Sequence, residues 1–308
     1  QHTIRAFLPY TPLHYLLIPP APAAAVEPLS ALVMTSGNLS EEPIATDNAD
    51  ARLRLASIAD ACLMHDRPIH VRNDDSVMRL LTSGSHPASL YPLRRSRGYA
   101  PYPVAFPWEL APILACGGEL KNTYCLTQGR YAFISHHIGD LENYETLQSF
   151  ESGIDHYQRL FRITPAILAC DLHPDYLSTR YALERSQRQS LPLAQVQHHH
   201  AHIAACMLEN QVPTGQPVLG FAFDGTGYGI DGTIWGGEVL HTTYAGFTRL
   251  AHLEAFPLPG GELAIRQPWR IALGLLAKAG LDWETWLAPA RLLENQPTLE
   301  QALRHQLT

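Results

Sequence analysis

The run His198-His199-His200-Ala201-His202 carries the side chains that most readily bind a metal ion. On a helix, residues four positions apart share one face with Cβ atoms about 5–6 Å apart, so His198 and His202 can aim at the same ion. Asp224 follows the apolar run 218–223, a pattern typical of a buried strand, and its carboxylate is well placed as an oxygen ligand. These residues predict a His-His-Asp metal site with open coordination positions.

Other interpretations of the histidine run remain open. Surface histidines can cluster by chance, and an expression tag has a similar composition, although a tag lies at a terminus and this run is internal. A His-Glu-x-x-His protease uses its glutamate as general base, and His199 stands at that position here. Imidazole and carboxylate ligands suit zinc and iron alike, so the sequence leaves the identity of the metal open.

Two glycine-rich segments, 117–122 and 224–232, each follow a predicted strand. Because glycine has no Cβ, backbone N–H groups in such loops can turn toward phosphate oxygens. A strand-like segment follows the second loop, where a dinucleotide-binding fold requires a helix, which excludes that fold. The loops are then either tight β-hairpins or phosphate-binding loops. The candidate phosphate-binding residues are Gly117, Gly118, Lys121, Asn122, Gly225 and Gly227.

The N-terminal third contains a further set of polar residues near the ends of predicted strands. Hydroxyl and amide groups at a strand end, together with arginines that grip phosphate through two parallel hydrogen bonds, suit an ATP triphosphate. Each stretch taken alone could equally be a turn or a solvated basic edge. The candidate nucleotide-binding residues are Ser36, Asn38, Arg72, Ser76, Arg95 and Arg97.

The composition is that of an ordinary globular protein. The chain has 308 residues, enough for two domains, with 46% hydrophobic and 17% charged residues. A net charge of -7 gives no electrostatic basis for nonspecific nucleic-acid binding, so no nucleic-acid partner is predicted. Five scattered cysteines without a C-x-x-C pair argue against a disulfide framework and favour a reducing, cytoplasmic compartment. No apolar stretch reaches the ~18–20 residues of a membrane span, so no membrane association is predicted.

The pattern in the N-terminal third predicts an α/β segment. Strand-like runs cover residues 31–35, 61–64 and 77–81, and a helical pattern covers residues 48–59.

A proline-rich stretch over residues 100–108 then stiffens the chain and disfavours both helix and sheet. It is the best candidate for a domain boundary. We therefore expect one domain over residues 1–104, a linker over 105–111 and a second domain over 112–308.

The second domain shows a similar order of elements twice. Three strands and a helix, followed by further strands and helices, precede a second set of three strands and a helix. The duplication indicates an actin-like or ribonuclease-H-like α/β fold whose second lobe is truncated. In such a fold the two glycine-rich loops face each other across a nucleotide cleft. The predicted strands are 113–116, 123–127, 131–136, 166–170, 193–196, 218–223, 233–240 and 247–255, and the predicted helices are 142–161, 176–188, 198–208 and 267–279.

Several long strings occur together in an order typical of one family. With them the chain resembles the HypF family, the carbamoyltransferases of NiFe-hydrogenase maturation, over almost its whole length. The resemblance implies the C-terminal part of a YrdC-like domain over residues 1–104 and the N-terminal part of a TsaD-like domain over residues 112–308. The strings are Ser36-Gly37-Asn38, Arg94-Arg95-Ser96-Arg97-Gly98-Tyr99-Ala100-Pro101, Gly117-Gly118-Glu119-Leu120-Lys121-Asn122, the histidine run, Asp224-Gly225-Thr226-Gly227-Tyr228-Gly229 and Trp235-Gly236-Gly237-Glu238.

The resemblance also implies an activity. HypF-like proteins use carbamoyl phosphate and magnesium-bound ATP: carbamate is released, adenylated in the YrdC-like domain and transferred as a carbamoyl group to the C-terminal cysteine of HypE. That product is the precursor of the cyanide ligands. The N-terminal candidates would hold ATP or carbamoyl-adenylate, and His198, His202 and Asp224 would bind zinc or iron as a Lewis acid. His199 and His200 would orient ligands or pack. Because the partner supplies the thiol, no catalytic cysteine is expected in this chain.

Family members contain segments that have no counterpart in this sequence. An acylphosphatase domain, a cysteine-rich region and the first half of the YrdC-like domain would precede Gln1, and a further aspartate ligand would follow Thr308. We therefore expect the chain alone not to form carbamoyl-adenylate, and its three-ligand site either to bind metal weakly or to hold water.

Two other functions remain as alternatives. A tRNA threonylcarbamoyl-transfer protein has the same two folds, but the fusion of both in one chain and the string 224–229 resemble the HypF family more. The second alternative is a scaffold in which the metal has only a structural role. It predicts that transfer activity is unaltered when His198 and His202 are replaced by alanine in the full-length protein.

Overall fold

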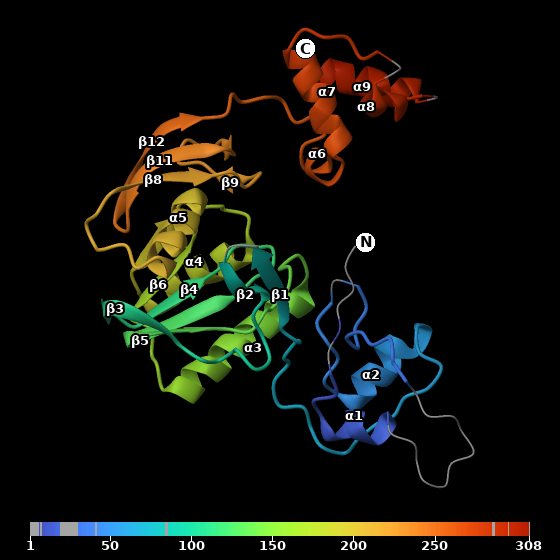
Figure 1. The fold of residues 1–308 in the computed structure, drawn as a ribbon, viewed down its shortest axis with the longest axis vertical. Helices are drawn as coiled ribbons and strands as arrows, with labels where there is room; N and C mark the ends of the chain where they lie inside the picture. The colour runs from blue at the N-terminus through green and yellow to red at the C-terminus, as the bar shows by residue number, and fades with distance from the viewer. Residues whose placement is uncertain are drawn as a thin grey trace. The chain divides into compact units, whose positions relative to one another are not determined.

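The computed structural model describes residues 6, 8–18, 30–40, 42–83, 86–284, 287–294 and 296–307. Figure 1 shows the helices and strands of these residues, which group into two compact units, residues 1–196 and residues 197–308. Both units mix helices with strands, as the predicted α/β class requires. Within the described residues, no helix combines the length and apolar character needed to span a bilayer.

The N-terminal part of the first unit has few regular elements, which are α1 (Pro12–Leu17), α2 (Asn48–Arg54), the 3-10 turn η1 (Leu55–Ser57) and the antiparallel hairpin of β1 (Val77–Ser83) and β2 (His86–Arg94). Asp47 caps α2, because its carboxylate accepts hydrogen bonds from the backbone N–H groups of Ala49 and Asp50. The predicted helix over residues 48–59 is confirmed in its first half. It tightens into η1 after Arg54.

Two of the three strands predicted in this part are wrong. Residues 31–35 and 61–64 form no regular structure and are largely exposed. A strand needs a neighbouring strand to satisfy its backbone hydrogen bonds, and within the described residues none pairs with either segment. The third predicted strand, 77–81, is confirmed as part of β1.

A five-stranded sheet forms the centre of the first unit, with α3 (Tyr144–Phe161) and α4 (Leu177–Gln189) packed against it. The strands are β3 (Val104–Leu110), β4 (Ile113–Cys116), β5 (Tyr124–Ile134), β6 (Ile167–Asp171) and β7 (Leu193–Val196). Their order is β3-β5-β4-β6-β7; β4, β6 and β7 are parallel, and β5 runs antiparallel to its neighbours β3 and β4. The helix α4 supplies the crossover that the parallel strands β6 and β7 require.

The proline-rich stretch does not interrupt this sheet, contrary to the prediction of a linker over residues 105–111. Residues 104–110 form β3, which lies at the edge of the sheet. Proline cannot donate to a β ladder and is tolerated on an edge strand, and the pairing of β3 with β5 is irregular between Ala105 and Leu110, where Pro107 lies. The domain boundary near residue 104 stays a prediction.

A second difference concerns the segment 123–136. It was expected to form two strands, but it contains one long strand, β5, in which Gly129 adopts a positive φ of 59° without turning the chain back. The place that a third strand of the repeat would take beside β5 is filled by β3.

One hydrophobic core joins the sheet to α3 and α4. Asn143 caps α3 through a hydrogen bond from the backbone N–H of Thr146. The helix lies very close to β5 at Gly153, where an added Cβ would come within 2.8 Å of the Tyr124 hydroxyl. The fully buried core residues are Leu114, Tyr124, Leu126, Leu141, Phe150, Ile154, Leu168 and Ala182.

The second unit begins with α5 (His198–Glu209), which covers a three-stranded antiparallel sheet of order β12-β11-β8. The strands are β8 (Val218–Ala222), β11 (Glu238–Thr243) and β12 (Gly246–His252), with a small hairpin of β9 (Gly227–Tyr228) and β10 (Ile234–Trp235) between β8 and β11. Ile203 and Met207 of α5 pack on Ala222 and Leu240 of the sheet. The predicted strand 233–240 is therefore divided between β10 and β11 by the turn at Gly236-Gly237.

The rest of the second unit is helical and has its own core. The predicted helix over residues 267–279 is confirmed as α7, which Pro268 starts at a position where its missing N–H is not needed. The Trp283 indole donates a hydrogen bond to the backbone oxygen of Leu273. The helices are α6 (Glu262–Arg266), α7 (Pro268–Lys278), α8 (Ala288–Arg291) and α9 (Pro297–Leu307), and the buried residues of this core are Leu273, Trp283, Ala290, Leu293 and Leu303.

Candidate functional site

The helix α5 presents the predicted metal ligands on one face. The Nε2 atom of His198 lies 3.2 Å from Nε2 of His202 and 3.4 Å from Oδ2 of Asp224. Nε2 of His202 lies 3.8 Å from the same carboxylate oxygen. All three ligand atoms are within 4.8 Å of one another, so the fold brings together the three residues that the spacing singled out.

The geometry of this cluster fits a metal ion. Two atoms bound to one tetrahedral zinc ion at about 2.0–2.1 Å each lie about 3.3 Å apart, close to the three separations observed here. Among the described residues, the buried Oδ2 atom of Asp224 accepts no hydrogen bond of good geometry. Two imidazole nitrogens and one carboxylate oxygen that converge on one point are a donor set that zinc and iron both accept.

His199 also contacts the cluster, from the buried side. Its imidazole is fully buried, and its Nε2 atom lies 3.3 Å from Oδ1 of Asp224. Burial lowers the pKa of His199, because desolvation disfavours the charged imidazolium; the Asp224 carboxylate opposes this effect. His200 has a different role, since its Nε2 atom lies 2.8 Å from the backbone oxygen of Thr243.

The glycine-rich loop after β8 packs tightly against α5. A Cβ atom at Gly227 would come within 2.5 Å of Cε1 of His199, so only glycine fits there. At Gly225 the same added atom would meet nothing within 4 Å, and the residue is exposed. The loop contains the β9–β10 hairpin that was one of its two interpretations. Gly225 is therefore open to a ligand, whereas Gly227 allows the close approach of loop and helix.

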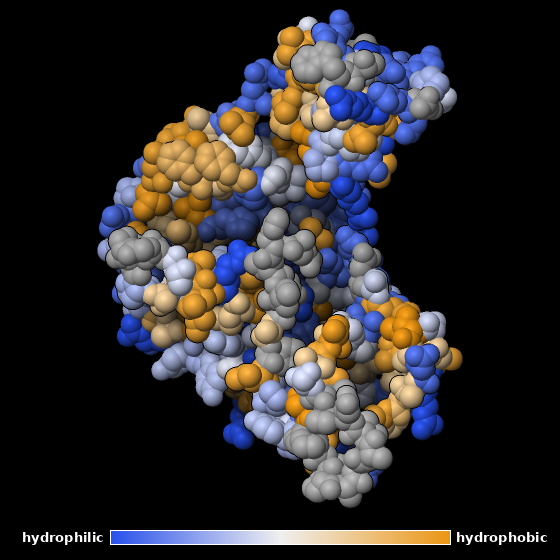
Figure 2. Space-filling view, turned by 45° about the vertical axis from the view of Figure 1, so that its right-hand side comes forward, coloured by the Kyte–Doolittle hydropathy of each residue, from blue (hydrophilic) through white to orange (hydrophobic). Residues whose placement is uncertain are grey.

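An apolar surface borders the cluster. A groove of about 610 Å³ is lined by His202 and Asp224 together with residues of α5 and β8. Three of the groove residues, Leu219, Phe221 and Phe223, are each more than half exposed. Figure 2 shows hydrophobic side chains gathered on one part of the surface.

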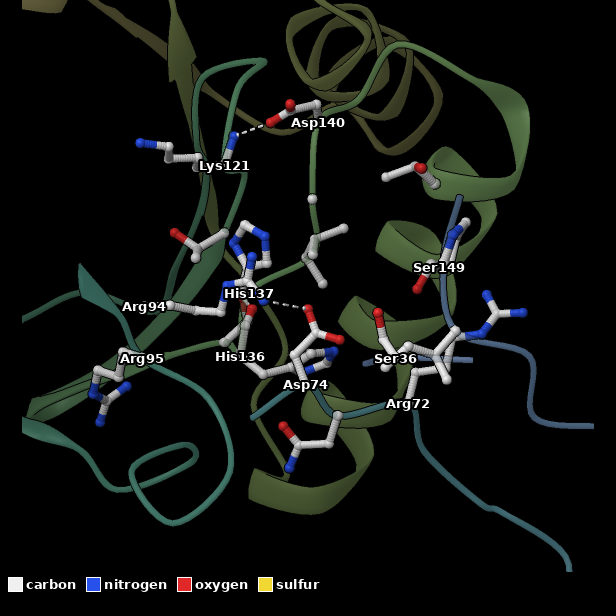
Figure 3. A pocket seen from close by; sticks show the side chains of 18 of the residues that line it. Ser36, Arg72, Asp74, Arg94, Arg95, Lys121, His136, His137, Asp140 and Ser149 are labelled. Carbon is white, nitrogen blue, oxygen red and sulfur yellow. Dashed lines mark hydrogen bonds and ion pairs between the residues drawn. The ribbon is translucent and has the colours of Figure 1, made fainter. Parts of the chain in front are cut away.

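The first unit contains a separate polar pocket of about 610 Å³ (Figure 3). Its walls come from the N-terminal part and from the segment between β5 and α3. Basic, acidic and hydroxyl side chains all contribute, a mixture that suits a polyanion with sugar hydroxyls. Five of the predicted nucleotide-binding residues line it, namely Ser36, Asn38, Arg72, Arg95 and Lys121.

Arg72 and Asn38 each have a buried polar atom that is available to a ligand. The buried Nε atom of Arg72 and the buried Oδ1 atom of Asn38 have no hydrogen-bond partner within the part of the chain that the structure describes. Burial lowers the pKa of Arg72, and the charge of Arg54 lowers it further. A buried guanidinium nitrogen without a partner is stabilised by an anion, so Arg72 is the best-placed phosphate ligand of the pocket.

Other predicted ligands are occupied by the protein itself. The Arg95 guanidinium donates to the backbone oxygens of Ile134, Tyr99 and Tyr102, and in Figure 3 it points away from the pocket. The Ser76 hydroxyl donates to the backbone oxygen of Arg97, at 2.8 Å, and accepts from the backbone N–H of Ser96. These residues stabilise the loop after β2.

Unlike Arg95, Arg97 does not line this pocket. Its guanidinium is half-exposed, pairs with Asp75 at 3.3 Å and donates to the backbone oxygen of Asn73.

The side chain of Asn122 closes the glycine-rich turn between β4 and β5. The buried Asn122 amide donates to the backbone oxygens of Gly117 and Gly118. A Cβ at Gly117 would lie 2.5 Å from the backbone oxygen of Thr123, so the turn requires glycine for packing alone. Of this turn only Lys121 lines the pocket, with a φ of 50° and its backbone N–H bonded to Asp140.

Two pocket residues, His136 and His137, were missed by sequence reasoning. Burial lowers the pKa of His136 to about 4 and, with the charge of Arg94, also lowers the pKa of His137. Both imidazoles are therefore neutral hydrogen-bonding groups at pH 7. The only signal in the sequence was two adjacent histidines at the end of the predicted strand 131–136. Polar residues are common at strand ends, so this signal does not indicate a site.

Family models match almost the whole chain. Residues 1–95 match the model described as "Telomere recombination" of the Sua5, YciO and YrdC proteins. Residues 109–209 match the HypF Kae1-like domain, and residues 220–308 match the second subdomain of the carbamoyltransferase Kae1-like domain.

Curated relatives give the same result. The chain is 45% identical over 280 residues to Carbamoyltransferase HypF2 of Cupriavidus necator, and 46% identical over 274 residues to Carbamoyltransferase HypF of a Synechocystis strain. Each match covers 89% of this chain and 34% of the relative. The chain therefore spans about a third of the length of these relatives.

Two solved structures share the fold. A full-length HypF in a phosphate- and nucleotide-bound form matches with a TM-score of 0.77 and 44% identity, over 88% of this chain and 41% of that one. The HypF of T. kodakarensis matches with a TM-score of 0.73 and 40% identity, over 80% of this chain and 31% of that one. The predicted pair of YrdC-like and TsaD-like, or Kae1-like, folds is confirmed.

Proposed function

Because the chain belongs to the HypF family of carbamoyltransferases, we propose that it provides a nucleotide pocket and a metal site for ATP-dependent carbamoyl transfer. The acceptor would be the C-terminal cysteine thiol of HypE, and carbamoyl phosphate would be the carbamoyl source. The compartment would be cytoplasmic. The observation that carries the proposal is the convergence of His198, His202 and Asp224 within 4.8 Å, in the part of the chain that matches the HypF Kae1-like models.

The polar pocket would bind magnesium-bound ATP and the carbamoyl-adenylate. Carbamate is a poor electrophile because its anionic oxygen is a poor leaving group. Adenylation joins that oxygen to the α-phosphate of ATP and releases pyrophosphate, so that AMP is the leaving group in the transfer step. The unpaired Nε of Arg72 and the basic Lys121 would contact phosphate oxygens, and Ser36 and Asn38 would offer neutral hydrogen bonds. Neutral His136 and His137 would add donors or acceptors without a further charge.

The metal site would act on the activated carbamoyl group. His198, His202 and Asp224 would hold zinc or iron, which supplies a Lewis acid that polarises the adenylate and orients it. Gly225, exposed and without a neighbour at its missing Cβ, leaves room for a nucleotide next to this site.

Three of the chain's five thiols are poor nucleophiles, which supports a nucleophile from the partner; the other two, Cys62 and Cys206, are exposed. Burial raises the pKa of Cys125 to about 12 and that of Cys170 to about 11, and it raises the pKa of Cys116 further. The thiolate, not the thiol, is the nucleophile, so these buried groups are unreactive at neutral pH.

The test compares two acceptors in a full-length family member. The protein receives carbamoyl phosphate, ATP and Mg²⁺ with either a cysteine-terminated peptide or tRNA, and mass spectrometry and AMP release report transfer. We expect a carbamoylated thiol peptide, and loss of that product when both equivalents of His198 and His202 are replaced by alanine. Transfer to tRNA, or unaltered transfer in the double variant, would contradict the proposal.

The 308-residue chain itself gives a second comparison. We expect it to bind ATP in equilibrium dialysis but to release no AMP from ATP and carbamoyl phosphate. AMP release that depends on carbamoyl phosphate would show that the chain is sufficient for adenylation.

A further inference from the structure

We propose that His199 is a positioning residue, which holds the Asp224 carboxylate in its metal-binding orientation as a neutral imidazole protonated at Nε2. Gln197 fixes this tautomer. The inference rests on the metal site proposed above and adds two residues, neither of them a ligand, that determine its geometry.

The orientation of the Gln197 amide follows from its backbone partners. Gln197 caps α5, and its Oε1 atom lies 2.9 Å from the backbone nitrogen of His200. A backbone N–H can only donate, so this side of the amide must be the oxygen. The other side is the NH₂ group, which also lies 3.3 Å from the backbone oxygen of Tyr228.

This orientation assigns the tautomer of His199. The Gln197 NH₂ group lies 3.0 Å from Nδ1 of His199. Because an amide NH₂ has no lone pair to accept with, Nδ1 must be the acceptor, and the proton of the neutral ring is then on Nε2. That Nε2–H faces Oδ1 of Asp224 at 3.3 Å.

The two oxygens of Asp224 are thereby given different tasks. Oδ1 faces the Nε2–H group of His199, and Oδ2 faces the two ligand histidines, His198 and His202. Nε2 of His199 is buried and makes no hydrogen bond of good geometry within the described residues, so Oδ1 of Asp224, 3.3 Å away, is the acceptor that it faces. A hydrogen bond to one carboxylate oxygen leaves the other directed at the ion and restricts rotation of the group.

The imidazole of His199 has no room to turn away. The loop passes so close at Gly227 that an added Cβ would overlap the ring. Trp235 lies against the ring with an interplanar angle of 24°, and the Arg249 guanidinium covers Trp235 at 4.0 Å. Arg249 is itself held by the fully buried Glu238 carboxylate, at 2.6 Å from its Nε atom.

A matched pair of variants on the same helix tests the role. His199→Leu and His200→Leu each remove a buried imidazole, but only His199 contacts Asp224. Zn²⁺ and Co²⁺ affinities are measured by competition with a chromophoric chelator, the Co²⁺ absorption spectrum reports ligand geometry, and circular dichroism reports folding. We expect His199→Leu to weaken metal binding by about 10–100-fold and to alter the Co²⁺ spectrum. His200→Leu should leave both unchanged, and His199→Gln, which keeps a donor, should restore part of the affinity.

The outcomes separate this inference from the proposed metal site. A folded wild-type chain that binds neither ion contradicts the site itself. Wild-type binding that is unchanged in His199→Leu contradicts the positioning role alone.

A direct measurement of the tautomer covers the case of an unfolded variant. Long-range ¹H–¹⁵N spectra of the wild-type chain distinguish Nε2–H from Nδ1–H imidazoles, and we expect the Nε2–H pattern for His199. Gln197→Glu places an acceptor opposite Nδ1, so it should move the proton to Nδ1 and weaken Co²⁺ binding. An Nδ1–H pattern in the wild-type chain would overturn the proposal.

Discussion

The metal cluster of the second unit and the polar pocket of the first unit are built in different ways. The cluster comes from one helix and one strand end, and its ligand atoms lie within 4.8 Å of one another. The pocket takes its walls from residues as far apart as Ser36 and Ser149, and one of its charged groups, Arg95, donates to nearby backbone oxygens. Polar atoms that converge on one point therefore indicate a ligand-binding site more reliably than the type of residue does.

Arginines of the first unit illustrate this difference. Arg72, Arg95 and Arg97 were predicted as equivalent phosphate ligands, yet Arg95 and Arg97 donate to backbone oxygens and only Arg72 keeps a buried, unpaired nitrogen in the pocket. In the second unit, by contrast, the three predicted ligands have equivalent positions around one point. The following predictions test, in both units, whether the residues whose polar atoms are available to a ligand are the ones that bind it.

The largest effect is expected for a direct ligand of the cluster. His202→Ala removes one of three donors and should lower Zn²⁺ affinity by more than about 100-fold, because loss of a residue that only orients a ligand already costs about 10–100-fold. Chelator competition measures the change. His241→Ala, an exposed histidine on β11, is the control and should bind as wild type does. Equal losses in both variants would mean that the histidines bind metal nonspecifically.

The next effect concerns the close contact between loop and helix in the second unit. Gly227→Ala should lower the free energy of unfolding by about 1–3 kcal/mol, since its Cβ would overlap His199. Urea titration followed by circular dichroism measures it. Gly225→Ala meets nothing within 4 Å and should be neutral for stability. A neutral Gly227→Ala would show that the loop is not fixed against α5.

The two sites also differ in how far the sequence predicted them. Helical spacing alone placed His198 and His202 on one face, and the apolar run before Asp224 placed it at a strand end, because both patterns are local. The contact of His199 with that carboxylate was not predicted. It depends on the side from which the loop approaches the helix, and a glycine at residue 227 does not reveal that side.

The pocket depended on contacts that no local pattern encodes. The strings around Ser36 and Arg72 indicated ligand binding, but the participation of His136 and His137 follows from the way the N-terminal part packs against the end of β5. The same applies to the fold. The βαβ elements of residues 113–209 were predicted from periodicity, whereas the edge strand β3 was not, because edge position is a property of the sheet and not of the segment.

A smaller effect should separate the arginines of the first unit. Arg72→Gln should weaken ATP binding to the chain by about tenfold, the cost of one charge-assisted contact. Arg97→Gln removes an equal charge from an ion pair outside the pocket and should leave the affinity near that of wild type. Equilibrium dialysis with ATP and Mg²⁺ measures both. If Arg97→Gln weakened binding as much as Arg72→Gln, the affinity for ATP would depend on the net charge of the chain and not on the unpaired nitrogen of Arg72.

The smallest effect is a dependence of stability on pH in the first unit. Burial raises the pKa of Glu119 to about 7, although a hydrogen bond from the backbone N–H of Leu177 opposes the shift. The folded state therefore holds a proton that the unfolded state releases above pH 4.5, so the contribution of Glu119 to stability falls as pH rises toward 7.

The effect of His136 on stability has the opposite pH dependence. With its pKa lowered to about 4, the unfolded state takes up a proton below pH 6.5 that the folded state excludes, and stability falls as pH drops.

Two variants separate these opposing contributions. Thermal melts from pH 4 to pH 8 should show that Glu119→Gln, which keeps an acceptor for Leu177, is more stable relative to wild type at pH 8 than at pH 5. His136→Gln should gain relative to wild type toward pH 4 instead. Glu119 is partly exposed, so solvent screens its charge and its effect should be the smaller of the two. Parallel pH profiles for both variants and wild type would mean that neither group titrates differently on folding.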